Sequence, residues 1–551
     1  MQEKGSGLSK RLTGFLLISI LMLLFGSIMA YAQEMSASIS SVTIGGQAND
    51  RINVNLQTNQ KTAGTDGKLY IFEMKPYQPE LTRLMKPVAS ADISGNMTVS
   101  FDLNAGPGEK RLYSAFMAAV KTGRGYEAVS DRHYITNPEV LAGNRDAARN
   151  PGKKGLRVDP NILDDALSLN IKHAGVDIPT HRFFGSGISY SYEGKTFSIN
   201  AELINQLDQE VKRLSDSGVA VTAILLNAWN TVTPELNRNG ISQLPAAQAQ
   251  YYTFNVETEA GFRAVKAMAS FLAKRYNGQN GHGKITNWVV GNEIDNQYWN
   301  YAGDFDVASY TRLFQRAFRV FYTAMKAESS NDNIMFSLDH YWNSLPEAAP
   351  VGKYKGRDVL EWFNHWDYAE GRTNWALAYH PYSYPLSSPE FWDDEESGKV
   401  DQTNDTQVIS FQNLHVLTDF MRNEAMLTPG GEVRKIFLTE QGFSSTKGKQ
   451  DKTQEQAAAV AYSYYIVDNN PYISAYLLSR QEDNEGETAH GLSFGLSSIQ
   501  NHQLVAKPAH EVFRYIDDPA KSLEVSEFAK EILGITDWSE RIPDFHAPAV
   551  G

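Results

Sequence analysis

Two rhythms of apolar and polar residues divide the chain. Between about residues 36 and 136, short alternating runs are separated by turn residues, and they cover residues 38–44, 51–56, 68–73, 97–102 and 112–121. Such alternation is typical of strands with one buried face, and several at short spacing predict an antiparallel β-sandwich. We predict this domain over residues 36–140. It carries no cluster of catalytic residue types, so a packing or spacer role is favoured over carbohydrate binding.

A Gly-, Asn-, Pro- and Lys-rich stretch, residues 143–155, predicts a linker, and the rhythm changes after it. Amphipathic segments with a helical period then alternate with short apolar runs. The predicted helices are residues 207–217, 261–276, 307–327, 359–368, 411–425 and 454–468. The apolar runs are residues 171–178, 219–226, 287–290, 334–338, 375–378, 435–438 and 473–478, with a weaker one at 154–158.

Near-continuous apolar strands between helices indicate a parallel sheet covered on both faces. Seven or eight such units predict an α/β fold, a (β/α)8 (TIM) barrel over residues 154–515, followed by a C-terminal tail over 516–551. A doubly wound open sheet is the alternative, but no Gly-rich phosphate loop follows any of the strands.

The N-terminus has the pattern of an export signal. Lys4, Lys10 and Arg11 precede an apolar run over residues 12–30, which ends in an Ala-Tyr-Ala sequence before Gln33. A basic start, an apolar centre and small residues at the end predict a signal peptide over residues 1–32, cleaved before Gln33, with an uncleaved membrane anchor as the alternative. We therefore expect an exported protein, periplasmic or extracellular, that is free of the membrane after cleavage.

Composition narrows the function classes. The chain has no cysteine, which excludes a disulfide framework, thiol catalysis and Cys-ligated metal sites. Its formal net charge is −13, so nucleic acid is not an expected partner. Hydrophobic residues make up 42% of the chain, which excludes a largely disordered protein.

Two glutamates follow apolar runs that lie three strands apart. Glu293 comes shortly after residues 287–290, and Glu440 shortly after residues 435–438. In a (β/α)8 barrel the carboxyl ends of the strands form one catalytic face, so both side chains are expected in the same cleft. Paired carboxyl groups suit the cleavage of a glycosidic bond, in which one acts as acid and base and the other as nucleophile.

The residues around the two glutamates are expected to set different pKa values. Asn292 offers an amide and Trp288 an apolar wall, which would raise the pKa of Glu293 by desolvation. Tyr382 and Arg480, after two other strands, are candidate hydrogen-bond donors that would keep Glu440 ionised.

Other polar and aromatic residues at strand ends are candidates for substrate binding. Aromatic rings there offer faces on which sugars stack, although ordinary packing is the alternative for each. The full set of substrate-binding candidates is Asn292, His380, Tyr382, Asn227, Trp229, His340, Trp342, Trp299 and Arg480.

Three of these strand-end segments resemble a known group of enzymes. Residues 288–293 (Trp-Val-Val-Gly-Asn-Glu) resemble the strand-four signature of clan A glycoside hydrolases, and residues 437–442 (Phe-Leu-Thr-Glu-Gln-Gly) resemble the strand-seven signature. His380-Pro-Tyr382 is similar to the motif that ends strand six. The resemblance covers roughly residues 154–515, and the whole chain also resembles a bacterial domain family of unknown function.

The resemblance implies a retaining glycoside hydrolase that uses no cofactor. It makes Glu293 the acid/base and Glu440 the nucleophile, places Asn292 on the sugar 2-hydroxyl, and implies an oligosaccharide or polysaccharide substrate. Retention predicts carboxyl groups about 5–5.5 Å apart. The chain departs from the pattern because no strand-two arginine is clearly placed and because Ser479-Arg480-Gln481 replaces the frequent strand-eight tryptophan. The sugar is therefore not transferred from the resemblance.

Two other functions stay open. The same fold suits a non-catalytic glycan-binding barrel, whose sign would be the loss of either glutamate, or a metal-dependent hydrolase. The chain has no His-Glu-x-x-His sequence and no tight spacing of His and Asp ligands, so we predict no metal site. The acidic stretch 482–487, just after the last strand, is a hypothetical substrate-selecting loop over the cleft.

Overall fold

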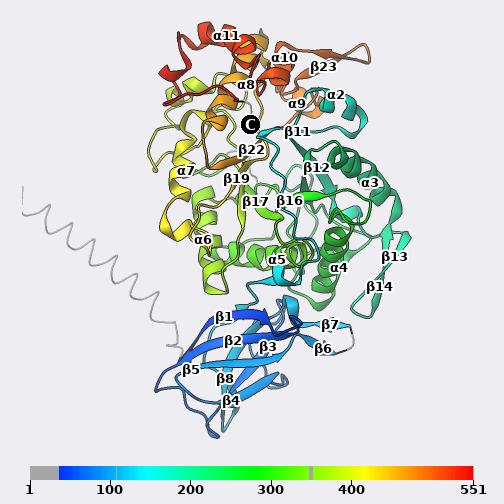
Figure 1. Cartoon of the computed structure of the whole chain (residues 1–551), viewed down its shortest axis with the longest axis vertical. Helices are drawn as coiled ribbons and strands as arrows, with labels where there is room; N and C mark the ends of the chain where they lie inside the picture. Colours follow the sequence, from blue (N-terminus) through cyan, green and yellow to red (C-terminus); the bar gives the residue numbers. More distant parts are fainter. Residues whose placement is uncertain (1–35, 107, 347–350, 550–551) are drawn as a thin grey trace, which may run out of the picture.

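The structure is a computed structural model that describes residues 36–106, 108–346 and 351–549. Figure 1 shows a small β-rich region joined to a larger barrel surrounded by helices. The predicted signal peptide, residues 1–32, lies outside the described residues. Within the described ranges, no helix combines the length and the apolar character that crossing a membrane requires.

The N-terminal region is built from two antiparallel sheets packed face to face. Their inner faces carry residues such as Val42 and Val54 on one side and Ile71 and Ala118 on the other, all buried. The alternation in the sequence therefore identified which face is buried. The first sheet contains β1 (Ala37–Gly45), β2 (Arg51–Thr58) and β5 (Asn96–Asp102); the second contains β10 (His133–Tyr134), β8 (Ala115–Thr122), β3 (Lys68–Met74) and β4 (Ala89–Asp92), with β9 (Gly125–Ala128) paired to β8.

Eight parallel strands then close into a barrel in the order of the chain. The weak run at 154–158 is the first of them, and it closes the barrel by pairing with both the second and the last strand. The predicted (β/α)8 fold is confirmed. The strands are β11 (Lys154–Arg157), β12 (His173–Pro179), β15 (Ala220–Leu226), β16 (Ile285–Val290), β17 (Asn333–Leu338), β18 (Ala376–Tyr379), β19 (Ile436–Leu438) and β22 (Ile473–Leu478).

Helices cover the outside of the barrel (Figure 1). Three of them start at a side chain that accepts hydrogen bonds from the amides of the first turn, namely Asn200, Thr258 and Asp306. The longer helices are α3 (Ala201–Asp216), α4 (Glu259–Arg275), α5 (Val307–Glu328), α6 (Gly356–Ala369), α7 (His415–Met421), α8 (Thr453–Asp468), α10 (Pro508–Tyr515) and α11 (Ser522–Leu533).

One predicted helix was too long. Residues 411–425 contain only α7, with a 3-10 turn on each side. Ser410 and Asn413 cap the first turn reciprocally, and the Asn413 amide also donates to the Val408 carbonyl. These side-chain hydrogen bonds compete with the regular helical pattern and delay its start.

The segment that the sequence assigned to a C-terminal tail is structured in its first part. Helix α11 packs against α8, and beyond it the Trp538 ring is fully buried. The centre of that ring lies 4.8 Å from the centre of the Tyr465 ring, in an edge-to-face arrangement. The segment therefore adds to the outer core of the barrel.

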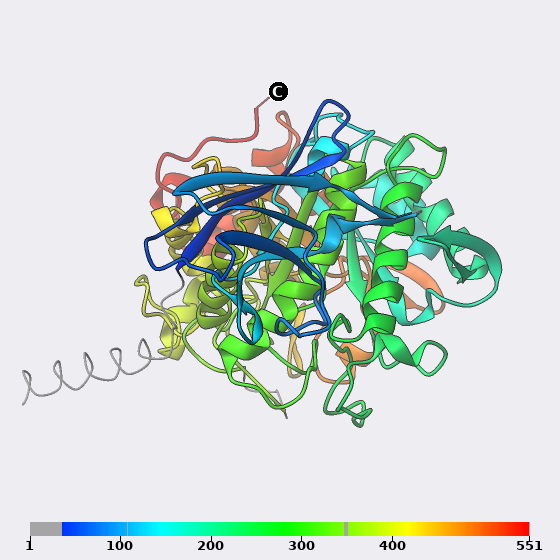
Figure 2. The same ribbon diagram turned by 90° about the horizontal axis from the view of Figure 1, so that it is seen from below.

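The sandwich packs on the helices of the barrel, as Figure 2 shows from below. The Tyr134 amide donates to the Glu370 carbonyl at 2.8 Å, and the Arg319 guanidinium lies 5.0 Å from the centre of the Tyr134 ring. Nearby, the rings of Tyr77 and Phe262 are 5.8 Å apart. These contacts fix the sandwich to α4, α5 and the end of α6.

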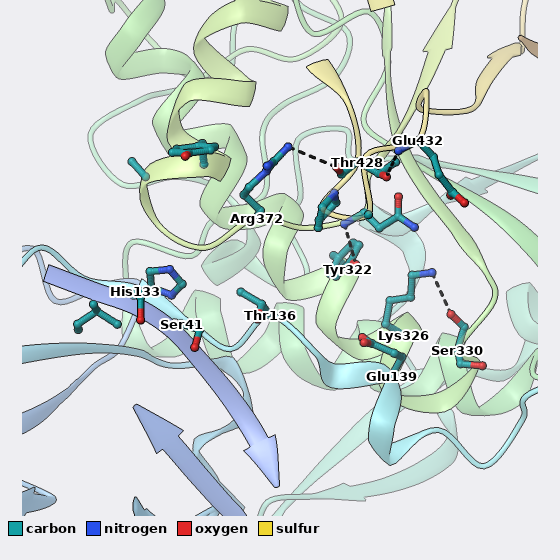
Figure 3. A pocket seen from close by; sticks show the side chains of 17 residues that line it. Ser41, His133, Thr136, Glu139, Tyr322, Lys326, Ser330, Arg372, Thr428 and Glu432 are labelled. Carbon is teal, nitrogen blue, oxygen red and sulfur yellow. Dashed lines mark hydrogen bonds between the residues drawn. The ribbon is translucent and has the colours of Figure 1, made fainter. Parts of the chain in front are cut away.

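A cavity of about 790 Å³ lies between the two regions (Figure 3). Ser41 and His133 of the sandwich line it on one side, and Lys326 and Arg372 of the barrel line it on the other. Its barrel residues end α5 and α6 or precede β18 and β19, so the cavity lies toward the amino ends of the strands. It is therefore at the opposite end of the barrel from the two glutamates.

Candidate active site

The turn after β16 holds Glu293 in an unusual backbone conformation. Gly291 has a φ of +77° and Glu293 a φ of +38°, and a residue with a side chain rarely adopts the second value. The Glu293 amide donates to the Ser337 hydroxyl at 2.8 Å, which fixes the turn against the end of β17. Strained backbone of this kind concentrates at functional sites. The Glu293 residue is only 6% exposed.

His380 is the direct partner of Glu293. Its Nδ1 lies 2.7 Å from Glu293 Oε1, and its Nε2 lies 3.0 Å from the Thr439 hydroxyl. Burial raises the pKa of Glu293 well above its usual value, and the nearby carboxylates of Asp339 and Glu440 raise it further. Burial also lowers the pKa of His380, which favours the neutral imidazole. These influences therefore favour the protonated form of Glu293.

Glu440 lies in surroundings of the opposite kind. The Tyr382 hydroxyl donates to its Oε1 at 2.9 Å, and the Arg157 guanidinium donates to its Oε2. Burial alone would raise the pKa of Glu440, but the positive charge of Arg157 outweighs it, and the pKa falls to about 2. Glu440 is therefore ionised over the whole physiological range.

Arg157 comes from β11 and is also anchored on its other side. Its Nη2 lies 2.6 Å from each carboxylate oxygen of Asp177, which is on β12. The sequence predicted Arg480 as the arginine that donates to Glu440, and the structure places Arg157 of the first strand there instead. The reason it was missed is that β11 has only four residues, so its end was the least certain in the pattern. An arginine directly after the apolar Leu156 was the available signal.

A model of a family of unknown function (DUF5722) matches residues 146–541. The chain belongs to this family. No curated protein matches the chain. Among solved structures, a family 39 glycoside hydrolase from the gut symbiont Bacteroides cellulosilyticus WH2 is similar, with 14% identity, a TM-score of 0.42, and coverage of 88% of this chain and 80% of that chain. A family 1 β-glucosidase from Thermotoga maritima, in complex with isofagomine lactam, is similar with 14% identity and a TM-score of 0.41. The match covers 64% of this chain and 84% of that chain.

Three of the predicted contacts are wrong in this family member. Trp288 forms no wall for Glu293, because side chains alternate along β16 and Val289 is the one that enters the barrel interior. The Trp288 ring instead packs outward, and its Nε1 donates to Asp332 at 3.1 Å.

Arg480 and Trp342 are the other two corrections. Arg480 makes no hydrogen bond to Glu440 within the described ranges; its Nε donates to Glu487 at 2.8 Å, although its charge still contributes to the low pKa of Glu440. Trp342 is fully buried, and the centre of its ring lies 4.9 Å from the centre of the Phe420 ring in an edge-to-face arrangement, so it packs the core and cannot stack on a substrate.

Two of the predicted substrate-binding residues are buried and contact the backbone of the site. Asn227 is buried, and its amide donates to the Tyr252 carbonyl at 3.2 Å, which holds the loop after β15. His340 is buried, with its Nδ1 3.2 Å from the Tyr382 carbonyl. Both residues therefore act on the scaffold of the site, and their burial leaves little surface for a substrate.

Three candidates keep exposed surface near the strand ends. Asn292 is half-buried, and its amide makes no hydrogen bond to any other described residue. Trp229 and Trp299 are half-buried as well, and the Trp299 ring stacks on Tyr251 with centres 5.9 Å apart. An available amide and a stacked aromatic pair are the features that a sugar would contact.

The described residues contain no group of three or more His, Asp or Glu side chains arranged to hold a metal ion. The Asp177 carboxylate is paired with Arg157, which also pairs with Glu440. What the site offers is one carboxyl group with a raised pKa and one with a lowered pKa, each with its own hydrogen-bond partner.

Proposed function

We propose that this protein is a retaining glycoside hydrolase. The observation that carries the proposal is the pair of buried carboxyl groups at the ends of β16 and β19, with the pKa of Glu293 raised and that of Glu440 lowered. A neutral acid and an ionised nucleophile at the same pH are what double displacement at an anomeric carbon requires.

In the first step, Glu440 attacks the anomeric carbon and forms a glycosyl ester, while the bond to the leaving oxygen breaks. Glu293 gives its proton to that oxygen. The hydrogen bonds around His380 favour this transfer when Nδ1–H donates to Glu293 Oε1 and Nε2 accepts from the Thr439 hydroxyl. Glu293 Oε2 then carries the proton toward the leaving group, and the imidazole fixes the orientation of the carboxyl group.

In the second step, the ionised Glu293 takes a proton from water, and the water oxygen attacks the anomeric carbon. The ester bond to Glu440 breaks, which returns both carboxyl groups to their starting states. The Tyr382 hydroxyl and Arg157 hold Glu440 in place and receive its charge again as it leaves. Asn292, with its amide free of other described partners, is proposed to bind the sugar 2-hydroxyl.

The substrate class is an oligosaccharide or polysaccharide. A sugar has apolar ring faces, and the Tyr251–Trp299 pair offers a matching surface. The N-terminal sequence pattern supports the further proposal that the enzyme is exported to the periplasm or the medium.

The test is the stereochemistry of the first product. The full chain is incubated with a panel of aryl glycosides and oligosaccharides, and proton NMR identifies the anomer formed first. We expect hydrolysis of at least one substrate with the anomeric configuration retained, and no loss of activity with a chelator. Inversion would contradict the roles given to the two glutamates, and no turnover on any substrate would favour a non-catalytic glycan-binding barrel.

A further inference from the structure

A cavity of about 540 Å³ opens at the carboxyl ends of β11, β12 and β22, beside Arg157. Because Arg157 donates to Glu440, the cavity adjoins the proposed nucleophile. Gly175 on β12 and residues 479–485, which follow β22, are among the residues that line it. The lining contains six acidic residues, namely Asp159, Asp177, Glu210, Glu482, Asp483 and Glu485.

Glu210 is the most unusual of these residues. It lies on α3, is only 9% exposed, and makes no hydrogen bond or ion pair with any other described residue. Burial raises the pKa of Glu210 to about 8, and the carboxylates of Asp177 and Asp159 add to the effect. A buried carboxyl group without a partner costs free energy, so the residue is placed for a donor that a ligand would bring.

The cationic groups in the lining are already engaged. Arg157 is paired with Asp177 and Glu440, and Arg480 with Glu487. These pairs leave no cation for Glu210.

The other acidic residues of the lining add further carboxyl groups, of which Asp483 has a cation of its own. Asp483 is neutralised by Lys507 at 2.6 Å. Burial raises the pKa of Glu482, and the neighbouring carboxylate of Asp159 raises it further. The cavity therefore has more carboxyl groups than cations, and burial raises the pKa of two of them, Glu210 and Glu482.

This excess excludes one class of ligand and favours another. A uronic acid or a sulfated sugar would bring another negative charge beside these carboxyl groups, which is unfavourable. No three of the carboxyl groups in the described ranges are arranged around a common metal position. An ammonium group has three donors, carries the complementary charge and needs no fixed coordination geometry.

We propose that this acidic cavity binds the ammonium group of an amino sugar, with Glu210 as its principal partner. The inference rests on the proposed function only for the consequence that such a sugar is part of the substrate. The binding itself does not require turnover. The acidic stretch 482–487, which the sequence singled out as a substrate-selecting loop, contributes three of the six acidic residues.

The test is calorimetric titration of the full chain at low salt and about pH 7.5, where sugar amines keep much of their positive charge and Glu210, with a pKa of about 8, can lose its proton when the ammonium group binds. The probes are the methyl glycosides of glucosamine, galactosamine and mannosamine, each compared with its N-acetylated and its hydroxyl counterpart. We expect at least one amine to bind about tenfold or more tightly than both counterparts, with the preference reduced by added salt. Glu210→Gln should abolish the preference, because glutamine keeps the shape of the side chain but cannot ionise against the ammonium group.

The matched control is Glu202→Gln, an exposed glutamate at the start of the same helix, which should keep the preference. If Glu210→Gln does not fold, as judged by its thermal unfolding, Glu482→Gln should reduce the preference in its place. Equal binding of the amines and their hydroxyl counterparts, or an unchanged preference in the Glu210 variant, would overturn the inference. Binding without hydrolysis of any glycoside would refute the proposed function alone, and hydrolysis of neutral glycosides without amine preference would refute this inference alone.

Discussion

The surroundings of Glu293 and Glu440 differ in one respect that decides their chemistry. Both residues are buried, and burial raises the pKa of each carboxyl group. On the β16 side the next influence is a carboxylate, Asp339, which reinforces burial. On the β19 side it is the guanidinium of Arg157, which reverses it. Burial therefore acts on the pKa of both groups in the same direction. The sign of one neighbouring charge then decides which carboxyl group is the acid and which is the nucleophile.

Removing either carboxyl group should give the largest and most distinct effects. Glu440→Ala loses the nucleophile, so turnover should fall on the order of 10⁴-fold or more for every substrate. Glu293→Ala should keep the first step for substrates with good leaving groups, and azide should then speed release of a product with retained configuration. Kinetics with and without azide separate the two variants. Exchanged phenotypes would reverse the assignment.

Arg157→Met tests the source of the difference between the two sides. Without the guanidinium, burial dominates and the pKa of Glu440 rises from about 2. Activity needs ionised Glu440, so the acidic limb of the pH profile should move to higher pH, and kcat/KM at neutral pH should fall about 100-fold.

The control for this prediction is Arg182→Met, because Arg182 is an exposed arginine on the loop after β12. It should leave the profile unchanged. If the acidic limb of the Arg157 variant stays in place while its thermal unfolding is normal, Arg157 is not what keeps Glu440 ionised.

The sequence predicted the barrel and both glutamates, because each depends on local order along the chain. Apolar runs spaced by helices determine where strands end, and Glu293 and Glu440 follow those ends directly. Tyr382 was predicted as a donor to Glu440 for the same reason, and the structure has that contact.

The remaining contacts could not be predicted because they depend on side-chain direction or on distant pairing. Trp288 faces away from the site, which follows from the alternation along β16 only once its register is known. Arg157 reaches Glu440 across the closure of the barrel, between residues 283 positions apart. Arg480 was expected on Glu440, but it pairs with Glu487, which lies on the short helix α9 (Glu485–Thr488), and the sequence does not specify the path of that segment.

Tyr382→Phe should have a smaller effect than the loss of Arg157. It removes one hydrogen bond to Glu440 and leaves the guanidinium in place. A hydrogen bond to a charged group contributes about 1.5–3 kcal/mol, so kcat/KM should fall roughly 10- to 100-fold. The acidic limb should move upward less than in the Arg157 variant. Steady-state kinetics over a range of pH checks both points, and a larger shift than that of Arg157→Met would make Tyr382 the principal group.

The smallest expected effect lies on the Glu293 side. The Asp339 carboxylate raises the pKa of Glu293, and Asp339→Asn removes that charge while keeping an oxygen for the His340 amide, which now donates to Oδ1 at 2.7 Å. Burial still acts, so the pKa of Glu293 should fall only in part. Activity needs protonated Glu293, and a lower pKa means that the proton is lost at lower pH. The basic limb of kcat/KM should therefore move to lower pH, by about one unit or less, while the acidic limb stays where Glu440 sets it. The conservative Asp339→Glu variant keeps the charge, so if it folds its basic limb should lie at the same pH as that of the native protein. A shift of the acidic limb instead would mean that Asp339 acts on the nucleophile, and the two sides of the site would then not be electrostatically separate.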